Sequence, residues 1–429
     1  MAMNDAFSPK IEVLFADQLW DSQLQADLLT VSVTDRLDAA DCCLLRFDNT
    51  DFRYHGHKSM APGNPIEVRL GWGDKADAVF YGEIVGTEMM FPRVGPPTVE
   101  VRAFDRLFRL MRNKQERTLL DMTDSDVAEK VASEHGLKSE VDSTSVKHPY
   151  LMQSGESDWD FLTERAQLSG RVVRVENKTL TFKDAATHPD PIAELTRESD
   201  LPTLRLDTSI ERLPSSVTVK GWDEASKKKV LGKAALSDIK PELKTTKLGA
   251  DIAKTVMGDA EWLVQDVPVD STEAADHLAK SVLRDTIAPF VSGQFTVQGN
   301  AKLRAGAVVD LKGLGDRLSG GYAIDASHHK CDDKGYTTKC EITRNGWIPP
   351  PPKPPKEEEV KPETVDIAVQ VVDSLGNPVG NADYVITLFD GKVRKGKTDG
   401  DGNIAEAGCP KGPYRIELAD SHISVLERK

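Results

Sequence analysis

The 429-residue sequence lacks the features that mark membrane, secreted and nucleic-acid-binding proteins. It has no run of about 18 apolar residues, the length that a membrane-spanning helix needs, so we expect no stable membrane insertion. Its start, MAMNDAFSPKIEVLF, has no basic stretch followed by an apolar block, which predicts no signal peptide and assembly in the cytoplasm. Basic residues are outnumbered, 55 against 69 acidic, for a net charge of -14. Because affinity for phosphate backbones comes chiefly from cations, nucleic acid is not an expected partner.

Cysteine is scarce and poorly placed for a disulfide. There are five cysteines, and no C-x-x-C pair occurs among them. If a hairpin turns at residues 333–334, Cys331 pairs near Tyr336 and Cys340 near Ser327, so these two thiols are not opposed. We therefore expect reduced cysteines.

Two clusters resemble metal sites only superficially. His328 and His329 lie close to Cys331, but neighbours in a strand point to opposite faces, and four converging zinc ligands are missing. Asp399 and Asp401 begin a sequence like a calcium loop, but isoleucine and proline occupy the positions of its glycine and its bidentate glutamate. The sequence therefore predicts no metal ligand.

Catalytic motifs are also missing. G-x-S-x-G, H-E-x-x-H and G-x-x-x-x-G-K-[ST] do not occur. Asp158, Asp160 and Glu164 are close together, but Asp158 is explained as a helix cap and Glu164 as part of an exposed face. A glycosidase needs two carboxylates about 5 to 9 Å apart in a cleft, which no spacing in sequence demonstrates. We expect no catalytic residue, no cofactor and no enzyme activity.

The first 115 residues are predicted to form an antiparallel barrel or sandwich. Alternating or apolar strand segments are punctuated by glycine and proline, and they lie at residues 11–15, 28–33, 41–47, 66–70, 79–85 and 98–103. A short amphipathic helix follows from Phe104, with Arg106, Arg109 and Arg112 on its polar side.

Residues 116–195 are predicted to form an α+β middle domain. Thr123 or Asp124 caps a first helix that ends near Gly136, and Ser157 or Asp158 starts a second that ends at Gly170. Residues 171–176 and 179–182 then alternate around a two-residue turn, which predicts a hairpin.

Strand patterns return in residues 196–347, which predict a second barrel with a helical insertion. The insertion is predicted to be helical at residues 272–286. It begins with a run of lysines, Lys227, Lys228, Lys229 and Lys233. We interpret this run as a solvated loop, and docking of a partner is the alternative. A weak repeat links the two strand regions, since the pattern around Gly63, with Gly82 and Ile84, echoes that around Gly306, with Gly321 and Ile324.

The middle region resembles the phage late control gene D family, the baseplate hubs of contractile tails, which includes the N-terminal part of type VI valine-glycine repeat proteins. The likeness rests on Gln153, on Ser157-Asp158-x-Asp160-Phe161-Leu162 and on Ala166-x-x-x-Gly170. It extends over residues 8–347, where the second barrel shows Gly306, Arg317-x-Ser-Gly-Gly-Tyr322 and a final Thr-x-x-x-x-Ile-x-Arg344. The resemblance implies two tube-protein-like barrels per chain, so that three chains match a sixfold tube and a threefold spike.

A proline-rich linker at residues 348–365 separates a C-terminal domain, residues 366–429. Pro349-Pro-Pro-Pro-Lys-Pro-Pro favours an extended polyproline helix that acts as a spacer. The last domain resembles transthyretin-like or carboxypeptidase-regulatory-like β-sandwiches, in which D-x-x-G-x-P-V and T-D-x-x-G mark the turns, here at residues 373–379 and 398–402.

Two classes of function follow. The first is a structural, trimeric baseplate hub of a phage tail, tailocin or extracellular injection particle. Its expected partners are further copies of itself, a separate spike, an inner tube or tube-initiator protein, and baseplate wedge proteins. The second is a secreted glycan-binding or hydrolytic protein with an accessory β-sandwich. The missing leader pattern and the middle-region motif favour the first.

Overall fold

The computed structural model describes residues 8–184, 188–223, 226–265, 267–347, 363–418 and 423–427. The chain divides into two compact units, Met1–Pro351 and Pro352–Lys429. Most of the proline-rich stretch, residues 348–362, lies outside the described residues. None of the described helices is long and apolar enough to cross a membrane.

The first strand set contains six antiparallel strands in the order β1-β5-β6-β7-β4-β3. They are β1 (Pro9–Phe15), β3 (Leu28–Arg36), β4 (Cys42–Asp48), β5 (Pro65–Trp72), β6 (Lys75–Met90) and β7 (Thr98–Phe104). Alternate side chains enter one core, as period-two patterning requires, and Val31, Leu45 and Val68 are fully buried there. Short elements complete the set: β2 (Gln18–Leu19), α1 (Ser22–Asp27) and α2 (Leu107–Arg112). Arg106 and Arg109 both bind Glu83.

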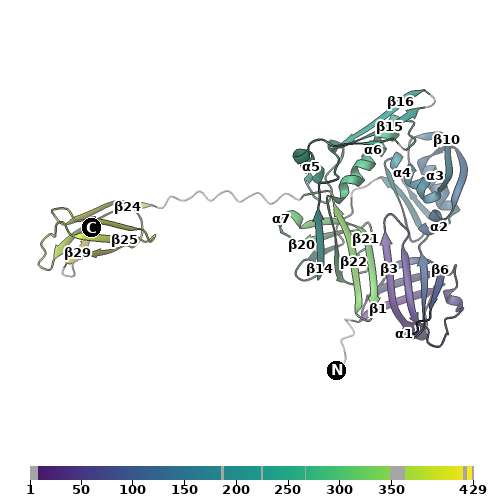
Figure 1. Ribbon diagram of the computed structural model, residues 1–429, viewed down its shortest axis with the longest axis horizontal. Coiled ribbons are helices and arrows are strands. Elements are labelled where there is room, and N and C mark those ends of the chain that lie inside the picture. Colours follow the sequence, from purple (N-terminus) through teal and green to yellow (C-terminus); the bar gives the residue numbers. More distant parts are fainter. Residues whose placement is uncertain are drawn as a thin grey trace. The chain divides into compact units, whose positions relative to one another are not determined.

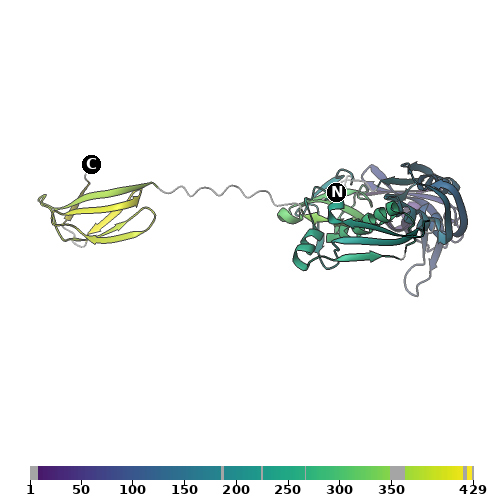
Figure 2. The ribbon, with the colours of Figure 1, turned by 90° about the horizontal axis from the view of Figure 1, so that it is seen from above.

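The second strand set has the order β13-β20-β21-β22-β19-β14. Its strands are β13 (Ala193–Thr196), β14 (Thr203–Thr208), β19 (Val291–Gln298), β20 (Val308–Lys312), β21 (Gly320–Asp332) and β22 (Gly335–Arg344). Its core is separate from the first and includes Phe295, Leu311 and Ile342. A ladder between β21 and β3 joins the two sets into one 13-stranded sheet, and Figure 1 shows the green β21 beside the purple β3. Figure 2 shows the same strands from above.

The mainly β fold class, with an α+β middle domain and a C-terminal β-sandwich, is confirmed. The expected barrels appear as the two six-stranded sets with separate cores. Among the described residues no ladder joins β1 to β3 or β13 to β14, so neither set closes through hydrogen bonds.

The middle region packs two helices against short sheets. Its elements are β8 (Lys114–Thr123), α3 (Asp124–Glu134), β9 (Lys138–Val141), β10 (Lys147–Ser157), α4 (Asp158–Leu168), β11 (Arg171–Glu176) and β12 (Thr179–Asp184). Both predicted helices and the predicted hairpin are confirmed, with Thr123 and Ser157 as the capping residues. Phe161 and Leu162 from α4 share a core with Val173 from β11.

The insertion in the second set is folded throughout most of its length. It contains β15 (Ser216–Asp223), β16 (Lys228–Ala235), β17 (Lys247–Leu248), α5 (Gly249–Met257), β18 (Glu261–Val264) and α6 (Thr272–Ile287), with 3-10 turns at Leu236–Asp238 and Ala288–Phe290. The predicted helix is confirmed as α6. The expectation of a lysine-rich loop is wrong for Lys228, Lys229 and Lys233, because they are exposed residues of the strand β16. The buried residues of β16, Val230 and Ala234, share a core with α6. Figure 1 places the insertion and the middle region at the same end of the strands.

The C-terminal unit is a sandwich of two three-stranded sheets, β27-β24-β29 and β26-β25-β28. The strands are β24 (Thr364–Asp373), β25 (Asp383–Thr387), β26 (Val393–Lys397), β27 (Asn403–Pro410), β28 (Arg415–Leu418) and β29 (Ile423–Glu427). Val371, Ile386 and Ile404 lie in its core. The last strand of the first unit, β23 (Gly346–Trp347), pairs with β17.

Candidate assembly interface

The two strand sets share one strand order. In both, successive strands occupy the first, sixth, fifth, second, third and fourth positions across the sheet: β1, β3, β4, β5, β6, β7 and β13, β14, β19, β20, β21, β22. One pair differs, because β1 is antiparallel to β5 whereas β13 is parallel to β20. The chain therefore contains an internal duplication.

The Gly63 and Gly306 repeat predicted from sequence has a structural counterpart. Both glycines have positive φ, 94° and 86°, which explains why glycine is needed. Gly63 N donates to Ile84 O at 2.8 Å, and Gly306 N donates to Ile324 O at the same distance. A bulge follows each isoleucine, between Ile84 and Gly86 and between Ile324 and Ala326.

Residue correspondence extends across both sets. Cross-strand partners form one row in the first set, Ile84, Ala103, Cys43 and Val33, and the matching row in the second, Ile324, Ile342, Gly293 and Leu206. Strand β14 therefore corresponds to β3, and β6 corresponds to β21.

The junction between the sets is a β-ladder reinforced by polar contacts. β21 pairs antiparallel with β3, and His329 lies opposite Val33. On the other face of the ladder, His328 Nδ1 lies 3.0 Å from Thr34 Oγ1. The ladder shows how two related strand sets join edge to edge.

Buried carboxyl groups lie beside this junction. Arg304, from the loop before β20, ion-pairs with Asp35 and reaches Asp41 at 3.3 Å. Burial, with the negative charge of Asp35, raises the pKa of Asp41 to about 9. Burial also raises the pKa of Asp105 to about 7, and one oxygen of that carboxyl has no hydrogen-bond partner. The folded state therefore loses stability as the carboxyl groups of Asp41 and Asp105 ionise.

Strands β14 and β6 each have an edge without a pairing strand among the described residues. In the described part of the chain, β14 has a ladder only with β19, and β6 beyond Glu83 has one only with β7. Exposed edges of this type are templates for pairing with another chain. Each chain therefore offers one further copy of both partners of the β21–β3 junction.

The middle-region motif forms a buried polar network. Asp158, with 1% of its side chain exposed, accepts from Arg117 at 2.7 Å, from Gln153 at 3.1 Å and from Gln115 at 2.9 Å, and pairs with His135 at 2.9 Å. Burial alone would raise the pKa of Asp158, but the bonds to His135 and Gln153 and the charge of Arg117 outweigh it and lower the pKa.

A second network repeats this chemistry at the other helix start. Asp124 accepts from Arg165 at 2.6 Å and lies 3.4 Å from His148. Gln153 and Asp158 of the motif both accept from Arg117 of β8, and Asp158 balances its charge. Arg165 of α4 is paired in the same way with Asp124 of α3.

The residues considered as catalytic groups or metal ligands make structural contacts instead. Ser157, not Asp158, is the helix cap, and Asp160 accepts from Ser157 Oγ at 2.7 Å. Glu164 is partly buried, so its assignment to an exposed face was wrong. Among the described residues no group of three His, Cys, Asp or Glu side chains is arranged to hold a metal.

Histidine and cysteine positions follow the predicted hairpin register. His329 is buried and lies 2.9 Å from Tyr336 Oη, while His328 faces Thr34. Cys331 lies opposite Tyr336, and Cys340 opposite Ser327, as predicted. All five cysteines are free thiols.

The fold is similar to that of solved tail proteins. The structure is similar to the 43 kDa tail protein of prophage MuSo2 from Shewanella oneidensis, with a TM-score of 0.60, 15% identity and coverage of 79% of this chain and 98% of that chain. It is also similar to a tail protein from Neisseria meningitidis MC58, with a TM-score of 0.58, 15% identity and coverage of 80% and 99%.

Comparison of the sequence with family models identifies the family of this chain. A family model described as the Alg8 N-terminal domain matches residues 11–333, and the chain belongs to that family. This description differs from the late control gene D resemblance that the middle-region motif predicts. No curated protein matches the sequence significantly.

Proposed function

We propose that the chain is a structural baseplate hub, a homotrimer that joins a sixfold inner tube to a threefold spike. The observation that carries the proposal is the internal duplication, together with the β21–β3 junction and its two unused edges. A chain built from two related halves presents each half three times in a trimer, which gives six similar positions around one axis.

The junction within the chain supplies the register for contacts between chains. His329 lies five residues after Ile324 and faces Val33. Met89 lies five residues after Ile84, and Leu206 corresponds to Val33. The proposed intermolecular ladder therefore places Met89 of one copy opposite Leu206 of the next, with Glu88 opposite Asp207.

This contact is heterologous, because β6 of one copy meets β14 of another. Heterologous contacts close into rings or propagate as helices. Closure at three chains is what the hub resemblance implies, since three chains supply six strand sets. Glu88 and Asp207 would repel directly across the ladder, and Arg102, 4.0 Å from Glu88, offsets their charge.

The proposal includes partners and location. The hub would bind a tube or tube-initiator protein, wedge proteins and a spike formed by a separate chain. It would assemble in the cytoplasm and become part of a phage tail or extracellular injection particle. We propose no catalytic activity, and the polar networks of the middle region support a structural role.

Disulfide trapping tests the ladder. The double variant Glu88→Cys/Asp207→Cys changes two exposed side chains and, under oxidation in assembling particles, should give cross-linked products that end at three chains. A mixture of the two single variants should give only dimers. The pair Glu88→Cys/Thr203→Cys is the matched control, because four residues of strand separate Thr203 from Asp207, about 13 Å. Equal cross-linking of the control pair, or none by the test pair in assembled particles, would refute the register.

A further inference from the structure

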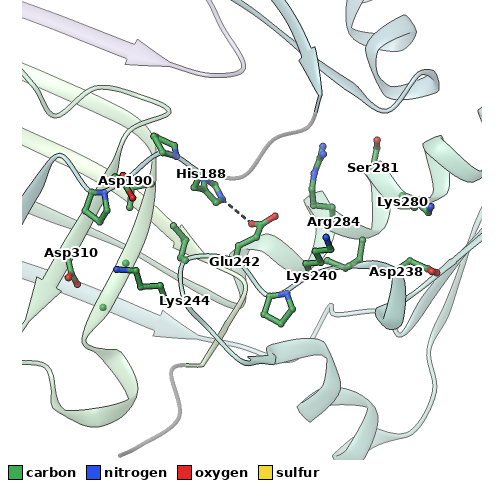
Figure 3. Close-up of a pocket in the computed structure, with 18 of the residues that line it drawn as sticks. His188, Asp190, Asp238, Lys240, Glu242, Lys244, Lys280, Ser281, Arg284 and Asp310 are labelled. Atoms are coloured by element: carbon green, nitrogen blue, oxygen red, sulfur yellow. Dashed lines mark hydrogen bonds and ion pairs between the residues drawn. The ribbon is translucent and has the colours of Figure 1, made fainter. Parts of the chain in front are cut away.

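Two cavities open beside the second strand set. The larger, about 790 Å³, lies between α6, the loop 238–244 and the segment 188–191. Figure 3 shows the pair of His188 and Glu242, 3.0 Å apart, at its centre. Lysines and acids both line it, namely Lys240, Lys244 and Lys280 with Asp190, Asp238 and Glu242. Its charge therefore selects no class of ligand.

The smaller cavity, about 480 Å³, lies at one end of the unpaired strand β14. Its lining includes Leu201 and Pro202, directly before that strand, and Val297 of the neighbouring β19. Leu201 and Val297 also belong to the core of the second set, so the cavity reaches that core. The charged residues of its lining are both acidic, Glu198 and Asp200.

In the first strand set the matching place is filled. Val297 corresponds to Phe47, because each lies four residues beyond the row of matched partners. The core that contains Phe47 takes in Cys331 and Tyr336 from the second set, which are 3% and 2% exposed. Tyr336 stacks on Trp72, with 5.9 Å between ring centroids. The β21–β3 junction thus inserts the end of a hairpin into the neighbouring core.

An exposed aromatic pair lies at the corresponding end of β6. Phe91 directly follows β6 and is 61% exposed, and Phe52, 56% exposed, stacks on it with 6.1 Å between ring centroids. Phe52 has a φ of 54°, a conformation that bulky side chains rarely adopt and that is found at functional sites. Val94 beside this pair is 88% exposed. Large apolar groups exposed together mark interaction sites.

The register of the β6–β14 ladder brings this pair to the cavity. Phe91 corresponds to Cys331, since each lies seven residues after its matched isoleucine. Cys331 faces Val31, which corresponds to Leu204. Phe91 of one copy therefore lies opposite Leu204 of the next, two residues from Pro202. Figure 1 shows β6 and β14 on opposite flanks of this unit, as a contact between successive copies requires.

We propose that the Phe52–Phe91 pair of one copy inserts into the cavity beside Pro202 of the next copy. This inference rests on the ladder proposed above and assigns that interface a second contact. Charge supports the same occupant, because Arg93 follows the aromatic pair and Glu198 lines the cavity. Both are exposed, and in the described part of the chain no ion pair involves either. Arg93 of one copy would pair with Glu198 of the next.

The test uses the variant Glu88→Cys/Asp207→Cys in assembling particles, because its rate of cross-linking reports formation of the ladder. Adding Phe91→Ser removes the inserted ring and should slow the three-chain product by roughly fivefold or more. Adding Leu120→Ser, at a residue of β8 that is 62% exposed, should change that rate by less than about twofold. The melting temperatures should be equal, because the changed side chains are exposed.

A charge exchange tests the same contact without changing an apolar residue. In the same background Arg93→Glu should slow the product roughly fivefold, and adding Glu198→Arg should restore the rate to within about twofold. An unchanged rate with Phe91→Ser, as expected if another protein fills the cavity, would overturn the insertion. So would an equal loss with Leu120→Ser or no restoration by the exchange, and in these cases the ladder would stand. If the parent variant gives no three-chain product, the ladder fails and the insertion fails with it.

Discussion

Removing Asp158 should destabilise the middle region more than removing any exposed carboxylate nearby. Asp158→Ala deletes the acceptor shared by Arg117, Gln153 and His135. Arg117, whose side chain is 16% exposed, then keeps its ion pair with Glu134 and its hydrogen bond to Gln153, but loses its buried ion-pair partner. Breaking a buried ion pair by removing one partner costs about 3–5 kcal/mol. The matched control, Asp160→Ala, removes an exposed residue that bonds only the cap Ser157, and should cost about 1 kcal/mol or less.

Hydrogen exchange of α3 and α4 in the full chain measures this loss locally. A cost of about 3–5 kcal/mol corresponds to exchange faster by roughly 150- to 4,000-fold where local opening limits exchange. Because the folded-state pKa of Asp158 is lowered, its contribution is present above the unfolded pKa and is lost as pH falls through the folded pKa. The difference between wild type and Asp158→Ala should therefore shrink in acid. Equal exchange in Asp158→Ala and Asp160→Ala at neutral pH would show that the Asp158 network does not stabilise the middle region.

Three further predictions concern other parts of the chain. Phe161 is 4% exposed, so Phe161→Ala leaves a cavity in the core and should lower the free energy of unfolding by about 3–5 kcal/mol. An unchanged melting temperature would show that Phe161 does not belong to the core. Asp105→Asn should raise the free energy of unfolding at pH 8 but not near pH 4. The pKa of Asp105 in the folded state is raised to about 7, so the wild-type protein loses stability as the pH rises from about 4 to 7. This loss is at most about 4 kcal/mol. Urea unfolding at both pH values checks this, and a loss of stability at pH 8 would contradict it. A chain ending at residue 348 should still trimerise and start tube assembly; particles without any baseplate would show that residues 349–429 are integral to the hub.

The middle region was the most predictable part of the fold. Its caps, helix periodicity and hairpin turn are local signals, and the helices begin at the predicted residues. The pairing of β8 with β10 was not predicted, because it joins segments about 30 residues apart through side chains that carry no clear alternation. The charge pattern around the lysine run predicted a loop, whereas the segment forms the strand β16. Val230 and Ala234 of this strand are buried through contact with α6, which is distant in sequence and leaves no local signal.

The candidate interface was only partly visible in the sequence. The two glycines with positive φ left a detectable repeat, because few other residues tolerate that conformation. The β21–β3 junction and the unpaired edges left no such signal, since ladder contacts are made by backbone groups that every residue has.

Cryo-electron microscopy of the chain in assembled particles would show how its copies meet. We expect three copies around one axis, with six similar strand sets and a β14–β6 ladder between neighbouring copies in which Met89 lies opposite Leu206. A chain that stays monomeric when tube and spike proteins are present, or a ring whose copies meet through other surfaces while β14 and β6 remain unpaired, would contradict it.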